Sequence, residues 1–175
     1  MKLPTKLIVL TVLFIGFSSF NLLAKVKVGE PLPEFELPRV ENTVRVNTKS
    51  LLGKVVYVDF WASWCKPCIE SFPRLNTLYN EYNQQGFEIL AVNLDQRKQL
   101  ASDFLEKYPV DYINTYDENM KVGRIFNVSV MPVGYLIDRK GIVRAIHHGF
   151  KPGDEIKMAK AIKILLKDKN VNSDS

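Results

Sequence analysis

Cysteine, histidine and tryptophan are scarce in this sequence, and each occurs only twice in 175 residues. A structural zinc site needs four ligands, and beside Cys65 and Cys68 the remaining candidates are His147 and His148. Adjacent residues on a strand point to opposite faces, so these two histidines do not easily serve one site. The scarcity argues against zinc, no metal site is expected, and both histidines are expected to have structural roles.

Charge of one sign does not dominate the chain either. Lys and Arg total 24 against 19 Asp and Glu, and the basic residues are spread along the sequence. A basic patch or stripe is the usual footprint of nucleic-acid binding, so no nucleic-acid partner is expected. Internal repeats are also lacking. The length suits one domain with a buried core.

Long hydrophobic runs are lacking except near the N-terminus. There the short basic segment MKLPTK precedes a mostly apolar stretch of 14 residues, LIVLTVLFIGFSSF. This pattern is typical of an export signal, and the stretch is shorter than the roughly 20 residues of a membrane span. Residues 1–24 are therefore predicted to be a signal peptide cleaved after Ala24, or an uncleaved anchor in the inner membrane. Either outcome predicts a periplasmic or other extracytoplasmic domain, where disulfides can form.

The rest of the chain predicts an α/β domain over residues 25–168 and a disordered tail over 169–175. Strands are expected at residues 44–46, 53–62, 87–94, 130–138 and 142–150, and helices at 65–82, 97–108, 119–126 and 152–168. Successive strand-helix-strand units require right-handed crossovers, so the central strands should be parallel. The last two strands should form an antiparallel hairpin, and Pro73 should kink the first helix.

Both cysteines lie in one short segment, WASWCKPC at residues 61–68. A copper(I) carrier is one interpretation, because copper(I) accepts few, soft ligands and Met131 could supply another. A purely structural disulfide is also a weak interpretation, because closing so short a loop removes little chain entropy. A redox pair explains more of the surroundings. Cys65 stands where a strand passes into a helix, and the free N–H groups and dipole of a helix N-terminus favour a thiolate.

The segment VDFWASWCKPC closely resembles the active site of thioredoxins, in which a strand ending in Asp-Phe-Trp-Ala precedes Trp-Cys-x-Pro-Cys. Pro73 matches the proline that kinks the thioredoxin active-site helix, and Pro132 in VMPVGYLID matches the cis-proline beside the cysteines. An extra helix and strand between NLDQ and VSVMP, together with the export signal, resemble the TlpA-like branch of exported thiol:disulfide oxidoreductases. The resemblance covers about residues 29–168. It implies a thioredoxin fold: a central mixed sheet flanked by helices, with the TlpA-like insertion and an N-terminal β extension.

The same resemblance implies roles for individual residues. Cys65 would attack a substrate disulfide, Cys68 would resolve the mixed disulfide, and Asp59 would take the Cys68 proton. Substrate binding would fall to Trp64, Met131 and Pro132, and the active-site surroundings would be formed by Trp61, Lys66 and Pro67. No cofactor is implied beyond the Cys65–Cys68 disulfide.

Partners are implied in the same way. They are disulfide-containing substrate proteins and a membrane protein that carries electrons from cytoplasmic thioredoxin, and the protein itself is expected to be a monomer. The resemblance favours a reductant. A disulfide-forming oxidant stays an alternative, because Lys-Pro between the cysteines does not reveal the stability of the reduced form.

Two positions depart from the members of this branch that act in cytochrome c maturation. Those members usually have glutamate three residues after the second cysteine, where this chain has Ser71, and asparagine where it has Asp59. Glu70 would lie about 100° around the helix and is expected to be solvated. Thioredoxins also have a lysine near the aspartate, and the alignment places Ala91 there. A role dedicated to cytochrome c maturation is therefore not expected, and burial should raise the pKa of Asp59.

Overall fold

The computed structural model describes residues 26–168. The predictions of a signal or anchor at residues 1–24 and of a tail at 169–175 lie outside the described residues. Within residues 26–168, no helix is both long and apolar enough to cross a membrane.

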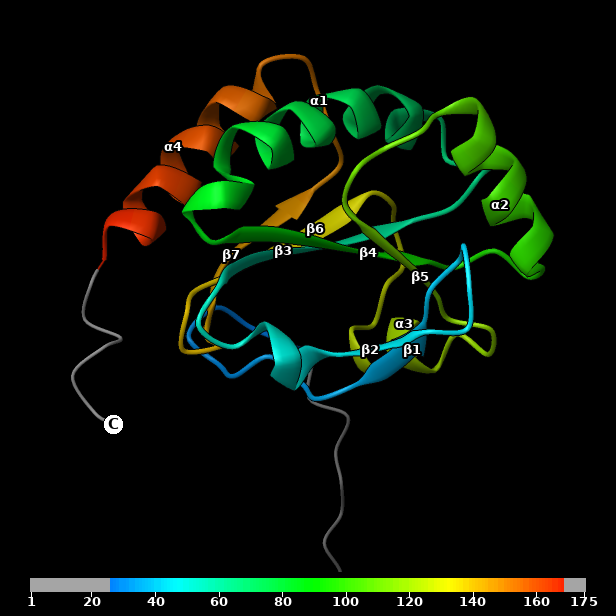
Figure 1. The fold of residues 1–175 in the computed structure, drawn as a ribbon, viewed down its shortest axis with the longest axis horizontal. Coiled ribbons are helices and arrows are strands. Elements are labelled where there is room, and N and C mark those ends of the chain that lie inside the picture. The colour runs from blue at the N-terminus through cyan, green and yellow to red at the C-terminus, as the bar shows by residue number, and fades with distance from the viewer. Residues whose placement is uncertain (1–25, 169–175) are drawn as a thin grey trace, which may run out of the picture.

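A mixed five-stranded sheet forms the centre of the molecule, with the strand order β5-β4-β3-β6-β7 (Figure 1). Its strands are Val55–Trp61 (β3), Phe87–Asn93 (β4), Ile113–Tyr116 (β5), Val133–Ile137 (β6) and Val143–His148 (β7). β3, β4 and β5 are parallel, whereas β6 pairs antiparallel with both β3 and β7. The predicted parallel centre and the predicted final hairpin are confirmed. All seven residues of β3 are buried, as its continuous β-branched and aromatic run indicates.

Helices and a small second sheet cover the two faces of the central sheet. The helices are Lys66–Tyr82 (α1), Lys98–Lys107 (α2), Lys121–Ile125 (α3) and Asp154–Lys167 (α4), and short 3-10 turns span Thr48–Leu51 and Asn83–Gln85. α1, α2 and α4 lie on one side of the sheet, and α3 lies on the other side with the antiparallel pair Glu36–Pro38 (β1) and Arg45–Asn47 (β2) (Figure 1). This arrangement confirms the predicted thioredoxin-like architecture with an N-terminal β extension.

Alternation along β3 divides the core into two halves. Tyr57 and Trp61 belong to the cluster under α1 and α4, whereas Val58 and Phe60 belong to the cluster on the opposite face. Successive residues of a strand point to opposite faces, so Asp59 points to the same side as Tyr57 and Trp61. A carboxyl group is thereby placed in the apolar layer beneath α1, the helix that carries the cysteines.

The observed elements differ from the predicted ones mainly at the periphery. β2 begins one residue later than predicted, and its partner β1 lies in a Pro-rich stretch for which no strand was predicted. α3 is shorter than the predicted helix over 119–126 because the Asp117 carboxylate accepts hydrogen bonds from the N–H groups of Lys121 and Gly123, which sets the start of the helix. Pro73 lies inside α1, which continues through it to Tyr82.

Candidate active site

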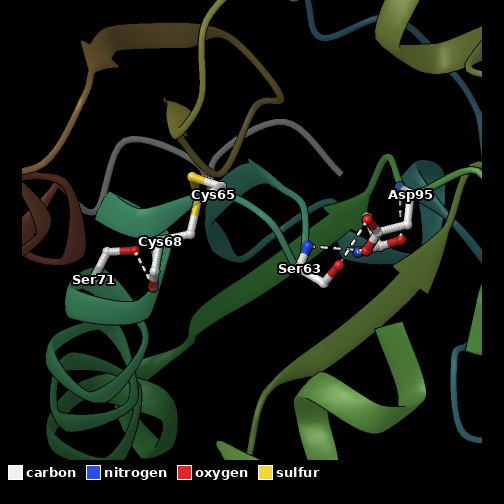
Figure 2. Close-up of a disulfide and its surroundings, with 6 residues drawn as sticks. Ser63, Cys65, Cys68, Ser71 and Asp95 are labelled. Atoms are coloured by element: carbon white, nitrogen blue, oxygen red, sulfur yellow. Dashed lines mark hydrogen bonds between the residues drawn. A yellow bond between two sulfur atoms is a disulfide. The ribbon is translucent and has the colours of Figure 1, made fainter. Parts of the chain in front are cut away.

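Cys65 and Cys68 are joined by a disulfide at the N-terminus of α1 (Figure 2). Cys65 is the N-cap residue, with an extended backbone, and Cys68 lies in the first turn with its N–H donating to the Cys65 carbonyl at 3.0 Å. Cys68 is fully buried, and Cys65 is 4% exposed. Cys65 is therefore the more accessible of the two cysteines, and the order of attack stays a prediction.

The first turns of α1 surround the pair with polar groups of different exposure. Lys66 and Pro67 are exposed, so the Lys66 charge stands at the rim of the site. Glu70 is exposed, as predicted. Ser71 is 1% exposed and its hydroxyl donates to the Cys68 carbonyl at 3.1 Å. The buried position three residues after Cys68 thus carries a hydroxyl satisfied by the helix backbone.

The two tryptophans occupy opposite environments. Trp61 is fully buried, and its ring centroid lies 4.8 Å from those of Phe72 and of Phe104. Trp64 is 67% exposed. Trp61 therefore fills the core behind the disulfide, while Trp64 presents an apolar surface next to Cys65.

Met131 and Pro132 directly precede β6. The Met131–Pro132 bond is cis, as predicted. Met131 and Trp64 line a common pocket of about 540 Å³, which also includes Leu100 of α2 and Met120 before α3. The predicted substrate-binding residues Trp64 and Met131 are thus brought together, and Pro132 follows Met131 as a buried residue at the start of β6.

Asp59 is buried in the middle of the sheet. It is 1% exposed, it pairs with Ala91 of β4 and Gly134 of β6, and among residues 26–168 its Oδ2 has no hydrogen-bond partner. Ala91 lies where the alignment placed it and supplies no charge. Burial raises the pKa of Asp59 from 3.8 to about 8. The carboxyl group is consequently mostly protonated at neutral pH and close to the point where it can gain or lose a proton.

A second buried acid, Asp95, holds the turn that leads to Cys65, and the sequence analysis did not identify it. The Asp95 carboxylate accepts hydrogen bonds from the N–H and the hydroxyl of Ser63, both at 2.9 Å, and from Asn93 Nδ2 at 2.8 Å (Figure 2). Asp95 is 1% exposed. Its three donors fix the segment between β3 and α1 against the end of β4.

A signal for Asp95 exists in the sequence. Asn93 and Asp95 directly follow the apolar run of β4, at the carboxyl end of a parallel strand, where functional groups of α/β sheets gather. The neighbouring strand, β3, ends at Trp61 and leads to the cysteines. Polar residues at this place are therefore candidates for positioning the redox turn.

The described part of the chain contains no group of three or more His, Cys, Asp or Glu side chains that could hold a metal ion. His147 and His148 lie on β7, with His147 half-buried and His148 exposed, as their alternation predicted.

Comparisons with known proteins agree on one kind of chemistry. The model of the Redoxin family matches residues 27–162. A thiol-disulfide oxidoreductase ResA of Bacillus cereus is 32% identical over 119 residues, which is 68% of each chain. ResA of Geobacillus thermodenitrificans is 36% identical over 132 residues, or 75% of each chain.

Solved structures give the same result. A thiol:disulfide interchange protein DsbE from Chlorobium tepidum superposes with a TM-score of 0.78 at 38% identity, covering 81% of this chain and 99% of that one. A protein disulfide isomerase from Bacteroides thetaiotaomicron has a TM-score of 0.76 at 22% identity, covering 83% of this chain and 93% of that chain, and shares the fold.

Proposed function

Because this chain belongs to the redoxin family and is a thiol:disulfide oxidoreductase, we propose that it reduces protein disulfides outside the cytoplasmic membrane. The observation that carries the proposal is the Cys65–Cys68 pair at the N-terminus of α1, with Cys65 slightly exposed and Cys68 fully buried. The names of the relatives support this chemistry over a copper(I) carrier built on the same cysteines.

The reaction proceeds in two thiol–disulfide exchanges. The Cys65 thiolate attacks one sulfur of the substrate disulfide, which forms a mixed disulfide and releases the other substrate sulfur as a thiolate. The Cys68 thiol then loses its proton and attacks the Cys65 sulfur. This step restores the Cys65–Cys68 disulfide and releases the second substrate thiolate, so two electrons pass to the substrate. The reaction needs no cofactor beyond the disulfide.

Asp59 is the group assigned to take the Cys68 proton, directly or through water. Its buried position on β3, below the helix that carries Cys68, and its pKa of about 8 support this role. A base is most effective when its pKa lies near the working pH. About a tenth of the Asp59 carboxyl groups are ionised at pH 7, which is enough to accept the proton in each turnover.

Substrate binding is assigned to Trp64, Met131 and Pro132. The exposed ring of Trp64, which directly precedes Cys65, and the Met131 side chain line one pocket, and an extended substrate segment would lie along the backbone at Met131 and Pro132. Trp61, Lys66 and Pro67 complete the surroundings: a core ring, a positive charge and a helix-starting proline.

The N-terminal segment suggests the location of the protein, and the chemistry suggests its partners. Residues 1–24 act as an export signal or as an anchor, so the domain works in the periplasm or an equivalent compartment. Its substrates are disulfide-containing proteins, which it meets as a monomer. The oxidised form is recharged by a membrane protein that passes electrons outward from cytoplasmic thioredoxin.

Trapping of the mixed disulfide tests the assignment of the two cysteines. Reduced Cys68→Ser, incubated with a disulfide-containing peptide, should accumulate a covalent adduct through Cys65, because the resolving thiol is missing. Cys65→Ser should give little adduct, since the remaining thiol is fully buried. Adducts of equal yield in the two variants, or none in either, would contradict the proposal.

A further inference from the structure

Asp59 must exchange one proton with solvent in each catalytic cycle if it serves as the base for Cys68. Its carboxyl group is 1% exposed and lies in the central strand. A buried acid–base group with this duty needs a chain of groups that can pass protons to the surface. The inference below rests on the proposed role of Asp59.

One row of residues runs across the sheet from Asp59 to the surface. Asp59 is paired with Gly134 of β6, and Gly134 is paired with His147 of β7. Directly opposed residues in a sheet point to the same face, so the Asp59 and His147 side chains both lie on the α4 side, separated by a residue without a side chain.

Tyr57 occupies the space above that glycine. A Cβ atom placed on Gly134 would overlap with the Tyr57 hydroxyl oxygen. Opposed Cβ atoms lie about 5 Å apart. Because the Tyr57 hydroxyl stands where a Gly134 Cβ atom would be, it lies at about this distance from the Cβ atoms of Asp59 and of His147. The missing side chain at Gly134 thus makes room for a hydroxyl between the two groups.

The far side of Tyr57 opens into a pocket of about 190 Å³ under α4, which His147 also lines. His147 is 29% exposed at its side chain, and its Nε2 lies 3.4 Å from Asp154 Oδ2 at the start of α4. Desolvation opposes ionisation of Asp154, yet the hydrogen bond from the Lys151 N–H and the charges of His147 and Lys157 keep the pKa of Asp154 below its ordinary value. A charged acceptor therefore stands at the surface end of the row.

We propose that Tyr57 and His147 form a proton route that connects Asp59 with solvent at the start of α4. When Asp59 releases the proton taken from Cys68, the Tyr57 oxygen accepts it while the Tyr57 hydroxyl proton passes to His147, directly or through water in the pocket. His147 then releases a proton to solvent beside Asp154. One proton moves outward, and Tyr57 and His147 return to the protonation states in which they began. The reverse sequence reloads Asp59.

The titratable and charged groups around this route come from three elements and one loop. Asp59 lies on β3, His147 on β7, and Asp154 and Lys157 on α4, while Tyr112, just before β5, interacts with Asp59 without lining the pocket. Burial, together with the charges of Asp59 and Asp154, holds the pKa of Tyr57 well above 10, so its hydroxyl keeps a proton to donate.

Single-turnover reduction of a disulfide peptide, followed by stopped flow from pH 6 to 8, tests the route. Tyr57→Phe and His147→Ala should each slow resolution of the mixed disulfide about tenfold at pH 7 while the first attack by Cys65 keeps its rate. Free imidazole should restore the rate of His147→Ala. Tyr112→Phe is the matched control, because it removes another buried hydroxyl near Asp59 that does not line the pocket.

The equilibrium of the Cys65–Cys68 pair with glutathione distinguishes a proton route from a purely structural role of Tyr57 and His147. A proton route changes rates and leaves the equilibrium with glutathione unchanged, whereas a change in packing shifts that equilibrium. Wild-type resolution rates in both variants, an equal loss in Tyr112→Phe, or a shifted equilibrium that accounts for the slower step would each overturn the inference. Asp59→Asn is measured alongside. If it resolves at the wild-type rate, the proposed base fails, whereas slow Asp59→Asn with fast Tyr57→Phe and His147→Ala refutes the route alone.

Discussion

Asp59 combines a charge-bearing group with a site that disfavours charge. It lies in a strand whose seven residues are all buried, and its strand neighbours at this level are Ala91 and Gly134. Desolvation alone raises the pKa of its carboxyl group to about 8. The same burial that suits Asp59 to accept a proton near neutral pH must therefore cost stability whenever it ionises.

The stability of the protein should fall as pH rises from about 4 to about 8. In this range the folded state keeps a proton on Asp59 that the unfolded chain has lost, so unfolding releases a proton and higher pH favours it. The loss at pH 7 is on the order of 4 kcal/mol, because pH 7 lies about three units above the ordinary pKa of 3.8 while the folded carboxyl, with a pKa of about 8, is still mostly protonated. Asp59→Asn should remove this dependence.

Urea unfolding of wild type and Asp59→Asn at several pH values measures the effect. The variant should be clearly more stable at pH 8, and the two proteins should converge near pH 4, where the wild-type carboxyl is neutral in both states. Two curves that run parallel over the whole range would show that Asp59 ionises in the folded protein as easily as in the unfolded chain.

At the scale of elements, two contacts join the strands to the active site. Asp95 at the end of β4 binds Ser63 between β3 and α1, and the Leu94 N–H donates to the Trp61 carbonyl at 2.9 Å. The position of Cys65 therefore depends on the register between β3 and β4 as well as on α1. Gly134 similarly allows β6 to pack against the Tyr57 side chain of β3.

Asp95→Asn should destabilise the fold and slow the first attack by Cys65. Asparagine has only one accepting oxygen and no charge. With that oxygen at the Oδ2 position, the Ser63 N–H and the Asn93 amide keep their acceptor but the Ser63 hydroxyl loses the one at Oδ1; in the other orientation, the asparagine amide faces both the Ser63 N–H and the Asn93 amide. A buried donor left without a partner costs about 1–3 kcal/mol. Asp103→Asn on the exposed surface of α2 is the control and should stay within about 0.5 kcal/mol of wild type. Equal urea midpoints and equal attack rates for the two variants would disprove the positioning role.

Gly134→Ala should be strongly destabilising by itself and partly rescued by Tyr57→Leu. The added methyl group would overlap with the Tyr57 hydroxyl, which cannot move freely in a buried layer. Overpacking of this kind typically costs about 1–3 kcal/mol. Urea unfolding of the two single variants and the double variant gives the coupling between the positions. Additive effects would mean that the Tyr57 ring does not occupy the space above Gly134.

Several of these features can be predicted from the sequence, and others can be predicted only when the register of the sheet is known. The apolar run around Asp59 predicts its burial, and the segment from Trp61 to Cys68 predicts the redox turn, because both signals are local. β1 could not be predicted in this way. Its Pro-rich composition does not indicate a strand, and its pairing with β2 depends on contacts across a loop. The juxtaposition of Tyr57, Gly134 and His147 depends on which residues of three strands stand opposite one another, and no local pattern indicates that.

At the scale of the whole molecule, the fold leaves Cys65 slightly exposed and buries Cys68 and Asp59 beneath it. Trp64 and Met131 border Cys65 on the outside, and Cys68, Trp61 and Asp59 lie in the layer between the sheet and α1. A dithiol in such a frame can give or take electrons, and the direction depends on the relative stability of the two redox states. The resemblance of the active site to that of thioredoxins, including Asp59, is the reason to expect a reductant, and the Lys-Pro pair between the cysteines does not decide the direction.

The redox potential of the Cys65–Cys68 pair tests this central claim most directly. The protein is equilibrated with glutathione or dithiothreitol buffers of known ratio, and the reduced fraction is measured by thiol alkylation. We expect a value nearer to about −270 mV, as in thioredoxin, than to about −120 mV, as in a strong disulfide-forming oxidant. A potential at the oxidising end of this range would contradict the assignment as a reductant and would instead identify a protein that forms disulfides.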